Sequence, residues 1–108
     1  MPPLPALTPA ERAAGLEKAA RARRERAQVK DRLKHGRATL PDVLERAAAD
    51  DVLAKMRVLE LLESMPGVGK VRARQIMERY GIAESRRIRG LGDNQRAGLE
   101  HEFAPLPV

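Results

Sequence analysis

Apolar residues recur along most of the chain at the spacing of a helix, and no segment alternates with the period of two that a half-buried strand shows. The clearest helix covers residues 70–80. Its apolar positions follow the i, i+3, i+4, i+7 pattern: Ala73, Ile76, Met77 and Tyr80. A second repeat covers residues 52–65, where a bend near Arg57-Val58 is expected to divide it into two helices. The pattern predicts an all-α fold.

A long helix is expected near the N-terminus. Thr8 is placed as an N-cap, with Pro9 at the first helical position and Glu11 at the third. Strong helix formers follow, and Gly36 is expected to close the helix. The resulting helix has about 27 residues and a length of about 40 Å.

Capping residues also mark the starts of the later helices. Thr39, with Asp42 three residues on, is expected to begin the next helix. Asp50 or Asp51 is expected to cap a third helix that starts at Val52, and Asp93 a last one. The middle of the chain is therefore interpreted as a helical scaffold.

The apolar stripe of the long helix is weak. Only Val29 and Leu33 are expected to enter a core, and Arg26 interrupts the stripe. Two interpretations remain open. The helix is either a solvated rod held by ion pairs such as Glu17–Arg21 and, at a looser spacing, Glu25–Lys30, or a basic arm that lies along a polyanion.

Four regions are predicted. Residues 1–7 and 104–108 are proline-rich tails expected to be disordered, and residues 8–36 form the long basic helix. Residues 37–103 form a small helical domain, with a core that must be aliphatic because only two residues of the whole chain are aromatic.

Charge is distributed in blocks. The net charge is +6, and residues 12–37 carry +7, residues 38–65 carry −3 and residues 66–96 carry +5. Sixteen of the 21 basic residues are Arg, whose guanidinium binds phosphate in a bidentate manner. Two basic segments on either side of an acidic, apolar middle indicate a polyanionic partner.

A glycine-bearing turn links an apolar helix to a second, amphipathic helix whose first residues are basic. Pro66 stops the first of them, and Gly67 and Gly69 allow a tight turn before a helix whose first residue is Lys70. A helix N-terminus with bare backbone and adjacent cations suits a phosphate. The segment lacks the strand and the G-x-x-x-x-G-K-[ST] spacing of a nucleotide-binding loop, so a nucleic-acid phosphate fits better. A simple turn between helices is the alternative.

A second turn of the same kind follows. Arg86, Arg87 and Arg89 lie within four residues and precede Gly90 and Gly92, just before the last helix. By itself such a cluster is also typical of a solvated turn. Its position after the first turn favours a second phosphate contact.

Several functions find no support in the sequence. No Cys is present, and His35 and His101 are too far apart to form a metal site by themselves. No Ser-His-acid or Cys-His set is apparent, and no apolar run approaches the roughly 20 residues of a membrane helix. We therefore expect neither catalysis, cofactor, small-molecule substrate nor membrane insertion.

Two segments closely resemble a known family. Residues 61–82 (LLESMPGVGKVRARQIMERYGI) and 84–95 (ESRRIRGLGDNQ), with KDRLK at 30–34, are similar to the actinobacterial integration host factors of mycobacteria and streptomycetes. The resemblance covers nearly the whole chain. It implies a helix-two-turn-helix domain like that of a ribosomal small-subunit protein.

The resemblance also implies function and site residues. It implies a nucleoid-associated, cytoplasmic protein that binds double-stranded DNA with little sequence preference, bends or compacts it, alters its topology and supports phage integrase complexes. The implied DNA-binding residues occupy the two turns: Gly67, Val68, Gly69, Lys70, Arg72, Arg74, Arg86, Arg87, Arg89, Gly90, Leu91, Gly92 and Asn94. The implied secondary contact lies on the long helix: Arg23, Arg26, Lys30 and Lys34.

Two other interpretations compete with this one. An RNA-binding, ribosome-associated protein would present the same turns to phosphates. A repair glycosylase would use an N-terminal proline as nucleophile, but Pro2 lacks an acidic neighbour and the chain is too short for a catalytic domain. Whether the protein bends or bridges DNA stays open, as does the choice between a monomer and weak self-association on DNA.

Overall fold

The computed structural model describes residues 6–104, so the predictions for residues 1–5 and 105–108 lie outside it. Seven helical elements follow one another within this range: α1 (Pro9–Lys34), α2 (Leu40–Ala47), α3 (Asp51–Ala54), α4 (Val58–Glu63), α5 (Lys70–Arg79), the 3-10 turn η1 (Ile88–Gly90) and α6 (Asp93–Glu102). The described backbone contains no strand, only one antiparallel bridge between Arg57 and Arg87. The all-α prediction is confirmed.

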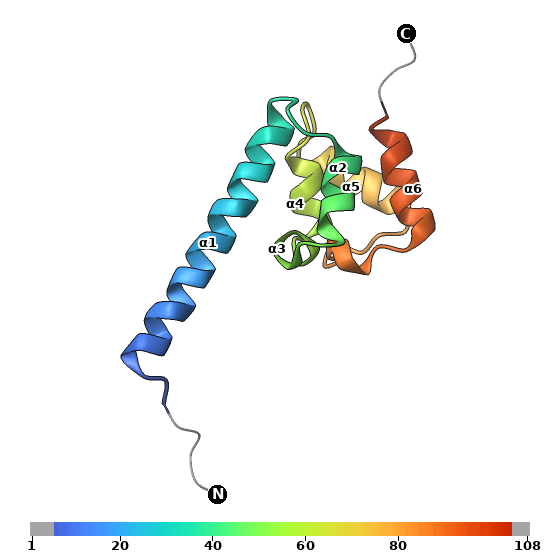
Figure 1. Ribbon diagram of the computed structural model, residues 1–108. Helices are drawn as coiled ribbons and strands as arrows, with labels where there is room; N and C mark the ends of the chain where they lie inside the picture. The colour runs from blue at the N-terminus through green and yellow to red at the C-terminus, as the bar shows by residue number, and fades with distance from the viewer. Residues whose placement is uncertain (1–5, 105–108) are drawn as a thin grey trace, which may run out of the picture.

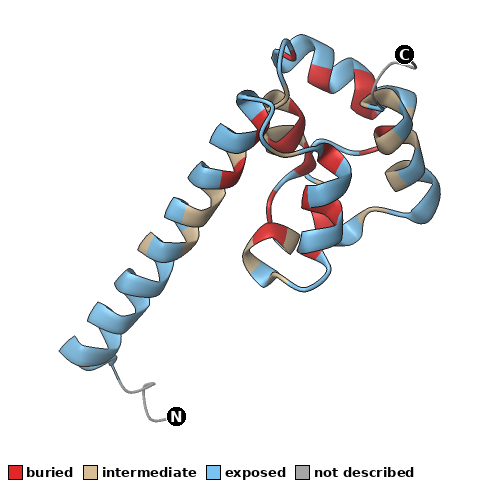
Figure 2. Cartoon of the chain, turned by 45° about the horizontal axis from the view of Figure 1, so that its top comes forward, coloured by how far each residue is buried: buried red, intermediate tan, exposed pale blue. Residues whose placement is uncertain are grey.

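Figure 1 shows α1 as an arm that projects from a cluster of the other helices. The molecule is 62 Å long, and its radius of gyration is 16.9 Å, whereas a compact chain of this length has about 13 Å. Val29 and Leu33 are the only buried residues of α1. The N-terminal part of the arm is exposed, as the burial colours of Figure 2 show. The expectation that only Val29 and Leu33 of α1 enter the core is confirmed, while the middle of α1 also contacts α3.

The domain is held by an aliphatic core in which α2 packs on α3 and α4 packs on α5. Its most deeply buried side chains come from every part of the domain and from α1: Leu33, Leu40, Leu53, Met56, Val58, Leu61, Leu62, Ile76, Met77 and Leu99. Each buried side chain of this size contributes about 1.5–3 kcal/mol of transfer free energy. No polar or charged residue is buried within residues 6–104, so the core leaves its cations on the surface.

Ion pairs fasten the end of α1 to this core. Lys30 Nζ lies 2.7 Å from Glu60 Oε1 of α4, and Arg46 of α2 lies 3.4 Å from Glu25 Oε1. The local pair Glu17–Arg21 forms as predicted, at 3.8 Å and with both side chains exposed.

The last helix packs on the C-terminal end of α5. Gly81 has φ 65°, and the N–H of Ile82 donates to the carbonyl of Met77 at 2.8 Å, so a Schellman motif ends α5. Gly98 of α6 lies against the ring of Tyr80, where an added Cβ would come within 2.4 Å of the ring. The Tyr80 hydroxyl donates to Glu102 at 3.1 Å.

Two predicted helix starts differ by one residue. The third helix begins at Asp51 because Asp50 caps it, and it ends after one turn at Ala54. The last helix is N-capped by Gly92, which has an extended backbone, so Asp93 is its first residue and not its cap. The side chain of Gln95 accepts from the Gly92 N–H at 3.0 Å and fixes this earlier start.

Candidate nucleic-acid interface

The first turn leaves the start of α5 open. Gly67 has φ 73°, a left-handed conformation that favours glycine. Gly69 is the N-cap of α5, and no side chain accepts from the N–H groups that follow it. Because the first N–H groups of a helix have no partner within it, three donors face outward beside Lys70.

Val68 has a different role from its neighbours. Its side chain is buried in the core, and its N–H donates to the carbonyl of Met65 at 3.1 Å. Val68 therefore shapes the turn from inside and offers neither a side chain nor a free N–H to a ligand. By contrast Val71, in the first turn of α5, is 69% exposed and was not singled out from the sequence.

A groove runs between this first turn and the docked end of α1. Lys30 and Lys34 of α1 line it opposite Gly67 and Gly69. Lys30 is engaged with Glu60, so Lys34 is the cation of this pair that has no ion-pair partner among residues 6–104. Lys30 and Lys34, which were predicted as part of the secondary contact, therefore lie beside the first turn.

The second turn is anchored to the α3–α4 junction by its backbone. The N–H of Val58 donates to the carbonyl of Arg86 at 3.0 Å, and the N–H of Ile88 donates to that of Met56 at 2.9 Å. Arg86 crosses over Gly90, whose missing Cβ would lie 2.9 Å from its Cδ, and donates to the Gly90 carbonyl at 2.6 Å. The φ of Gly90 is not positive, so a side chain at this position would conflict with the Arg86 side chain and not with the backbone conformation.

The three arginines of the second turn have no carboxylate partner within the described chain. Arg87 Nη1 donates to the carbonyl of Lys55 at 2.5 Å, and Arg89 is exposed. The positive charge of Arg89 also reaches Asp51. The pKa of Asp51 is lowered mainly by its bond to Lys55, with smaller contributions from Arg89 and Lys18.

The start of α6 is open as well. Its first N–H groups, from Asp93 to Gln95, have no side-chain cap, and Asn94 beside them is exposed. The N–H of Gly92 is not available, because Gln95 accepts from it. Leu91 is half-buried against the core, so its side chain serves packing.

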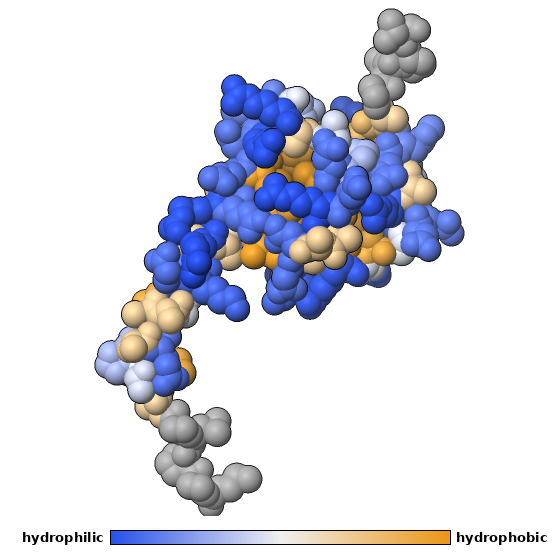
Figure 3. Space-filling model, in the orientation of Figure 1, coloured by the Kyte–Doolittle hydropathy of each residue, from blue (hydrophilic) through white to orange (hydrophobic). Residues whose placement is uncertain are grey.

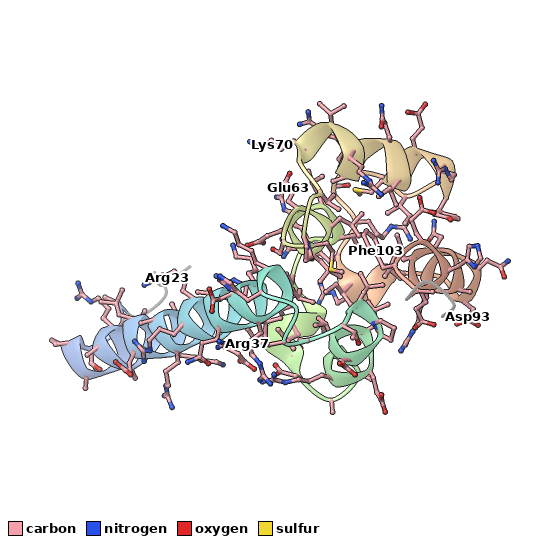
Figure 4. The ribbon with its side chains drawn as sticks, turned by 90° about the horizontal axis from the view of Figure 1, so that it is seen from above. Arg23, Arg37, Glu63, Lys70, Asp93 and Phe103 are labelled. Carbon is pink, nitrogen blue, oxygen red and sulfur yellow. The ribbon has the colours of Figure 1, made fainter. Side chains whose placement is uncertain are left out.

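The two open helix starts lie at opposite ends of α5. Gln95 Nε2 donates to the carbonyl of Gly81 at 3.0 Å, which places the start of α6 at the end of α5. Ten residues of helix span about 15 Å. Figure 4 shows Lys70 and Asp93 well separated. Each turn therefore needs a phosphate of its own, and a ligand with repeated phosphates suits both.

Within residues 6–104, Lys and Arg side chains without a carboxylate partner outnumber those in ion pairs. Eight of the 21 Lys and Arg residues pair with Asp or Glu. Of the residues expected at the site, Arg74 is engaged with Glu84 at 2.9 Å, whereas Arg23 and Arg72 are exposed without a carboxylate partner in residues 6–104. Hydrophilic side chains cover most of the face seen in Figure 3.

Two cations near the second turn were assigned to the scaffold by the sequence. Lys55 and Arg57 lie in the α3–α4 junction and line a hollow with Arg26 and Arg87. The signal was the Lys-Met-Arg tripeptide at residues 55–57, in which only the middle residue is buried. Their nearness to Arg87 follows from the Arg57–Arg87 bridge, which no local pattern reveals.

Other types of site find no counterpart among the described residues. Residues 6–104 contain no group of three or more His, Asp or Glu side chains that could hold a metal ion. In the same range, no helix is both long enough and apolar enough to span a bilayer.

Comparison with known proteins agrees with this geometry. Residues 33–103 match the family model described as the S13-like H2TH domain. The chain is 67% identical over 100 residues to the integration host factor of Streptomyces coelicolor and 57% identical over 100 residues to that of Mycobacterium tuberculosis. These alignments cover 93% of this chain and 94% and 95% of the two relatives.

A solved structure is similar over most of the chain. It is described as sIHF bound to an 8-bp palindromic DNA, is 66% identical, and superposes with a TM-score of 0.80. The match covers 82% of this chain and 99% of the other. With its S13-like H2TH domain and its two glycine turns, this chain belongs to the integration host factor family of Streptomyces and Mycobacterium.

Proposed function

We propose that this chain is a non-enzymatic architectural protein that binds double-stranded DNA through its sugar-phosphate backbone. One observation carries the proposal: two helix starts, N-capped by Gly69 and Gly92, leave backbone N–H groups open next to cations without carboxylate partners. Backbone N–H groups and Arg side chains bind phosphates without reading bases. The relative with known structure is described as bound to DNA.

Little sequence specificity is expected. Reading bases in the major groove requires a helix that presents side chains such as Asn, Gln or Arg to base edges. The exposed residues at the two turns instead approach as helix starts and loops. Binding is then sensitive to salt and favours DNA that is easily deformed. Bending, compaction and changes of DNA topology would follow from holding phosphates about one helix length apart.

From the resemblance to the family, we further propose that the protein lies in the nucleoid and supports phage integrase on DNA. The contact from Arg23, Arg26, Lys30 and Lys34 is proposed to be weaker than that of the turns, because Lys30 is already neutralised by Glu60.

Gel-shift titrations of Arg89→Ala on several unrelated duplexes test this function. Arg89 is exposed and its side chain makes no hydrogen bond or ion pair within residues 6–104, so its loss should leave the fold intact. We expect an affinity loss of about 5- to 10-fold at about 0.1 M salt, equal for all sequences, with a salt slope smaller by about one. A loss confined to one sequence would contradict backbone recognition.

Competition between duplex DNA and structured RNA at equal salt addresses the RNA-binding alternative. Both ligands present phosphates, so the turns alone do not discriminate between them. Preference for the RNA would overturn the proposal. Assays for nicking at damaged bases are expected to show no activity.

A further inference from the structure

Two adjoining hollows separate α1 from the α3–α4 junction. One is lined by Arg26, Lys55, Arg57 and Arg87, and the other by Lys18, Arg26 and Lys55. Because they share Arg26 and Lys55, they form one cleft, which we call the arm cleft. Its cations come from three separate segments of the chain: α1, the α3–α4 junction and the second turn.

The arm cleft keeps a positive charge after its own ion pairs are counted. Its acidic residues are Asp51 and Glu60, and each is already engaged: Asp51 by Lys55 at 2.9 Å and Glu60 by Lys30 at 2.7 Å. Arg26 and Arg57 have no carboxylate partner within residues 6–104. The Arg57 side chain makes no hydrogen bond to the α4 helix that it precedes.

The arm cleft is continuous with the second turn. Arg87 belongs to both, since its backbone bridges to Arg57 and its guanidinium donates to the Lys55 carbonyl. Arg89 of the turn and Lys18 of the arm both act on the pKa of Asp51, which lies at the start of α3 between them. A cationic surface therefore runs from the second turn across α3 to the middle of α1.

We infer that the arm cleft binds a backbone phosphate of the same duplex that the second turn holds, through Arg26 and Arg57. The inference rests on the proposed DNA binding and extends it to Arg57, which the sequence assigned to the scaffold, by joining it to Arg26 of the predicted secondary contact in one site. We assign a phosphodiester as its occupant for two reasons. The guanidinium groups of the cleft come from separate segments, and the cleft is continuous with the second turn, so a strand held by the turn would pass along it. One consequence is that α1 contacts the duplex already bound by the domain.

The Arg57→Gln variant tests the inference, with Arg37→Gln as the matched control. Both arginines are exposed and without carboxylate partners in the described chain, but Arg37 lines a separate hollow between α1 and α2. Arg57→Gln should weaken binding to duplex DNA about 5- to 10-fold at about 0.1 M salt and reduce the salt slope by about one. Arg37→Gln should change neither, and both variants should melt like the parent. Arg26→Gln, on the opposite wall, should also weaken binding, by a smaller factor than Arg89→Ala does.

The outcomes separate this inference from the proposed function. If Arg89→Ala weakens binding and Arg57→Gln does not, the arm cleft takes no DNA phosphate, while DNA binding by the turns stands. If Arg37→Gln weakens binding as much as Arg57→Gln, net charge and not a site accounts for the effect, and the inference falls. If Arg89→Ala has no effect on any duplex, the proposed function itself fails.

A titration with inorganic phosphate at constant ionic strength examines a free anion as the occupant. The Arg57 Nε–H signal in ¹H–¹⁵N spectra should move when duplex DNA is added and stay in place with phosphate. A saturating shift with inorganic phosphate alone would reassign the arm cleft to a free anion and overturn the inference.

Discussion

Five helix starts fall into two groups that differ in how their first N–H groups are satisfied, whereas α4 has no side-chain cap and its first N–H, from Val58, donates to the carbonyl of Arg86. Three helices in the first half of the chain are closed by side chains: Thr8 accepts from Glu11 at 3.1 Å, Thr39 from Asp42 at 3.3 Å, and Asp50 from Val52 at 3.0 Å. Helices α5 and α6 instead start at glycines, and no side chain accepts from their first N–H groups. All are ordinary helix starts, but only the second group leaves donors for a ligand.

The difference shows how one structural unit serves stability in one region and binding in another. An N-cap side chain contributes about 1 kcal/mol by satisfying N–H groups that a helix leaves open. Where that contribution is absent, the donors and the positive end of the helix dipole remain for an anion. The open start of α5 carries Lys70 and no acidic residue, whereas Asp42, Asp50 and also Asp93 of α6 lie at the other starts.

A capping side chain at the start of α5 should occupy the N–H groups that bind DNA. We expect this change to cause the largest loss of DNA affinity. Gly69 has an extended backbone that any residue adopts, and an added Cβ would meet nothing within 4 Å. Gly69→Asp therefore places a carboxylate over the first N–H groups of α5. DNA affinity should fall by at least about tenfold, from a lost phosphate contact and added repulsion, while stability rises by a few tenths of a kcal/mol. Gel shifts and thermal melts measure the two effects.

Gly69→Ala is the control for this variant, because it adds a Cβ without an acceptor or a charge. It should bind DNA nearly as the parent does. If Gly69→Ala lost as much affinity as Gly69→Asp, steric contact and not the open donors would explain the effect.

Opening a closed start should do the opposite. Thr39→Ala removes the side chain that accepts from Asp42 and leaves the start of α2 unsatisfied. Unfolding free energy should fall by about 1 kcal/mol, which corresponds to a lower melting temperature by about 4–8 °C for a domain of this size. Well below the melting temperature, DNA affinity should not change. A clear loss of affinity would instead place the start of α2 in the DNA interface.

Acid should open the same closed start in the parent protein, with a smaller effect. The Thr39 hydroxyl and the Thr39 N–H both hold the pKa of Asp42 below its ordinary value. A lowered folded-state pKa gives stability that is present above the unfolded pKa and is lost as pH falls through the folded one. The contribution of Asp42 should therefore disappear below about pH 4.

Asp42→Asn isolates that contribution. Its stability, measured by urea unfolding from pH 7 to pH 3, should fall less steeply on acidification than that of the parent. A parallel fall in both proteins would show that other carboxylates account for the acid dependence. Asp50, whose pKa is lowered chiefly by its bond to Glu25, continues to titrate in the variant.

The arm and the domain differ in how much of each was predictable. Helical spacing and capping residues predicted α1, α2 and α5 to within about two residues, because these signals are local. Val29 and Leu33 were correctly selected as the core residues of α1. Glu25 was expected to pair with Lys30 along the arm, and this was wrong. Both residues reach across to other helices, Glu25 to Arg46 and Lys30 to Glu60, because docking brings those partners closer than a five-residue step along the helix.

By itself the sequence determined the helices, the two glycine turns and the excess of cations around them, because each depends on residues near in the chain. Only the tertiary structure decided which of these groups are available. Packing buried Val68, and the bridge between Arg57 and Arg87 brought a scaffold segment to the second turn. The contacts of Arg87 with Lys55 and Arg57 join segments about 30 residues apart, and spacing along the chain carries no information about them.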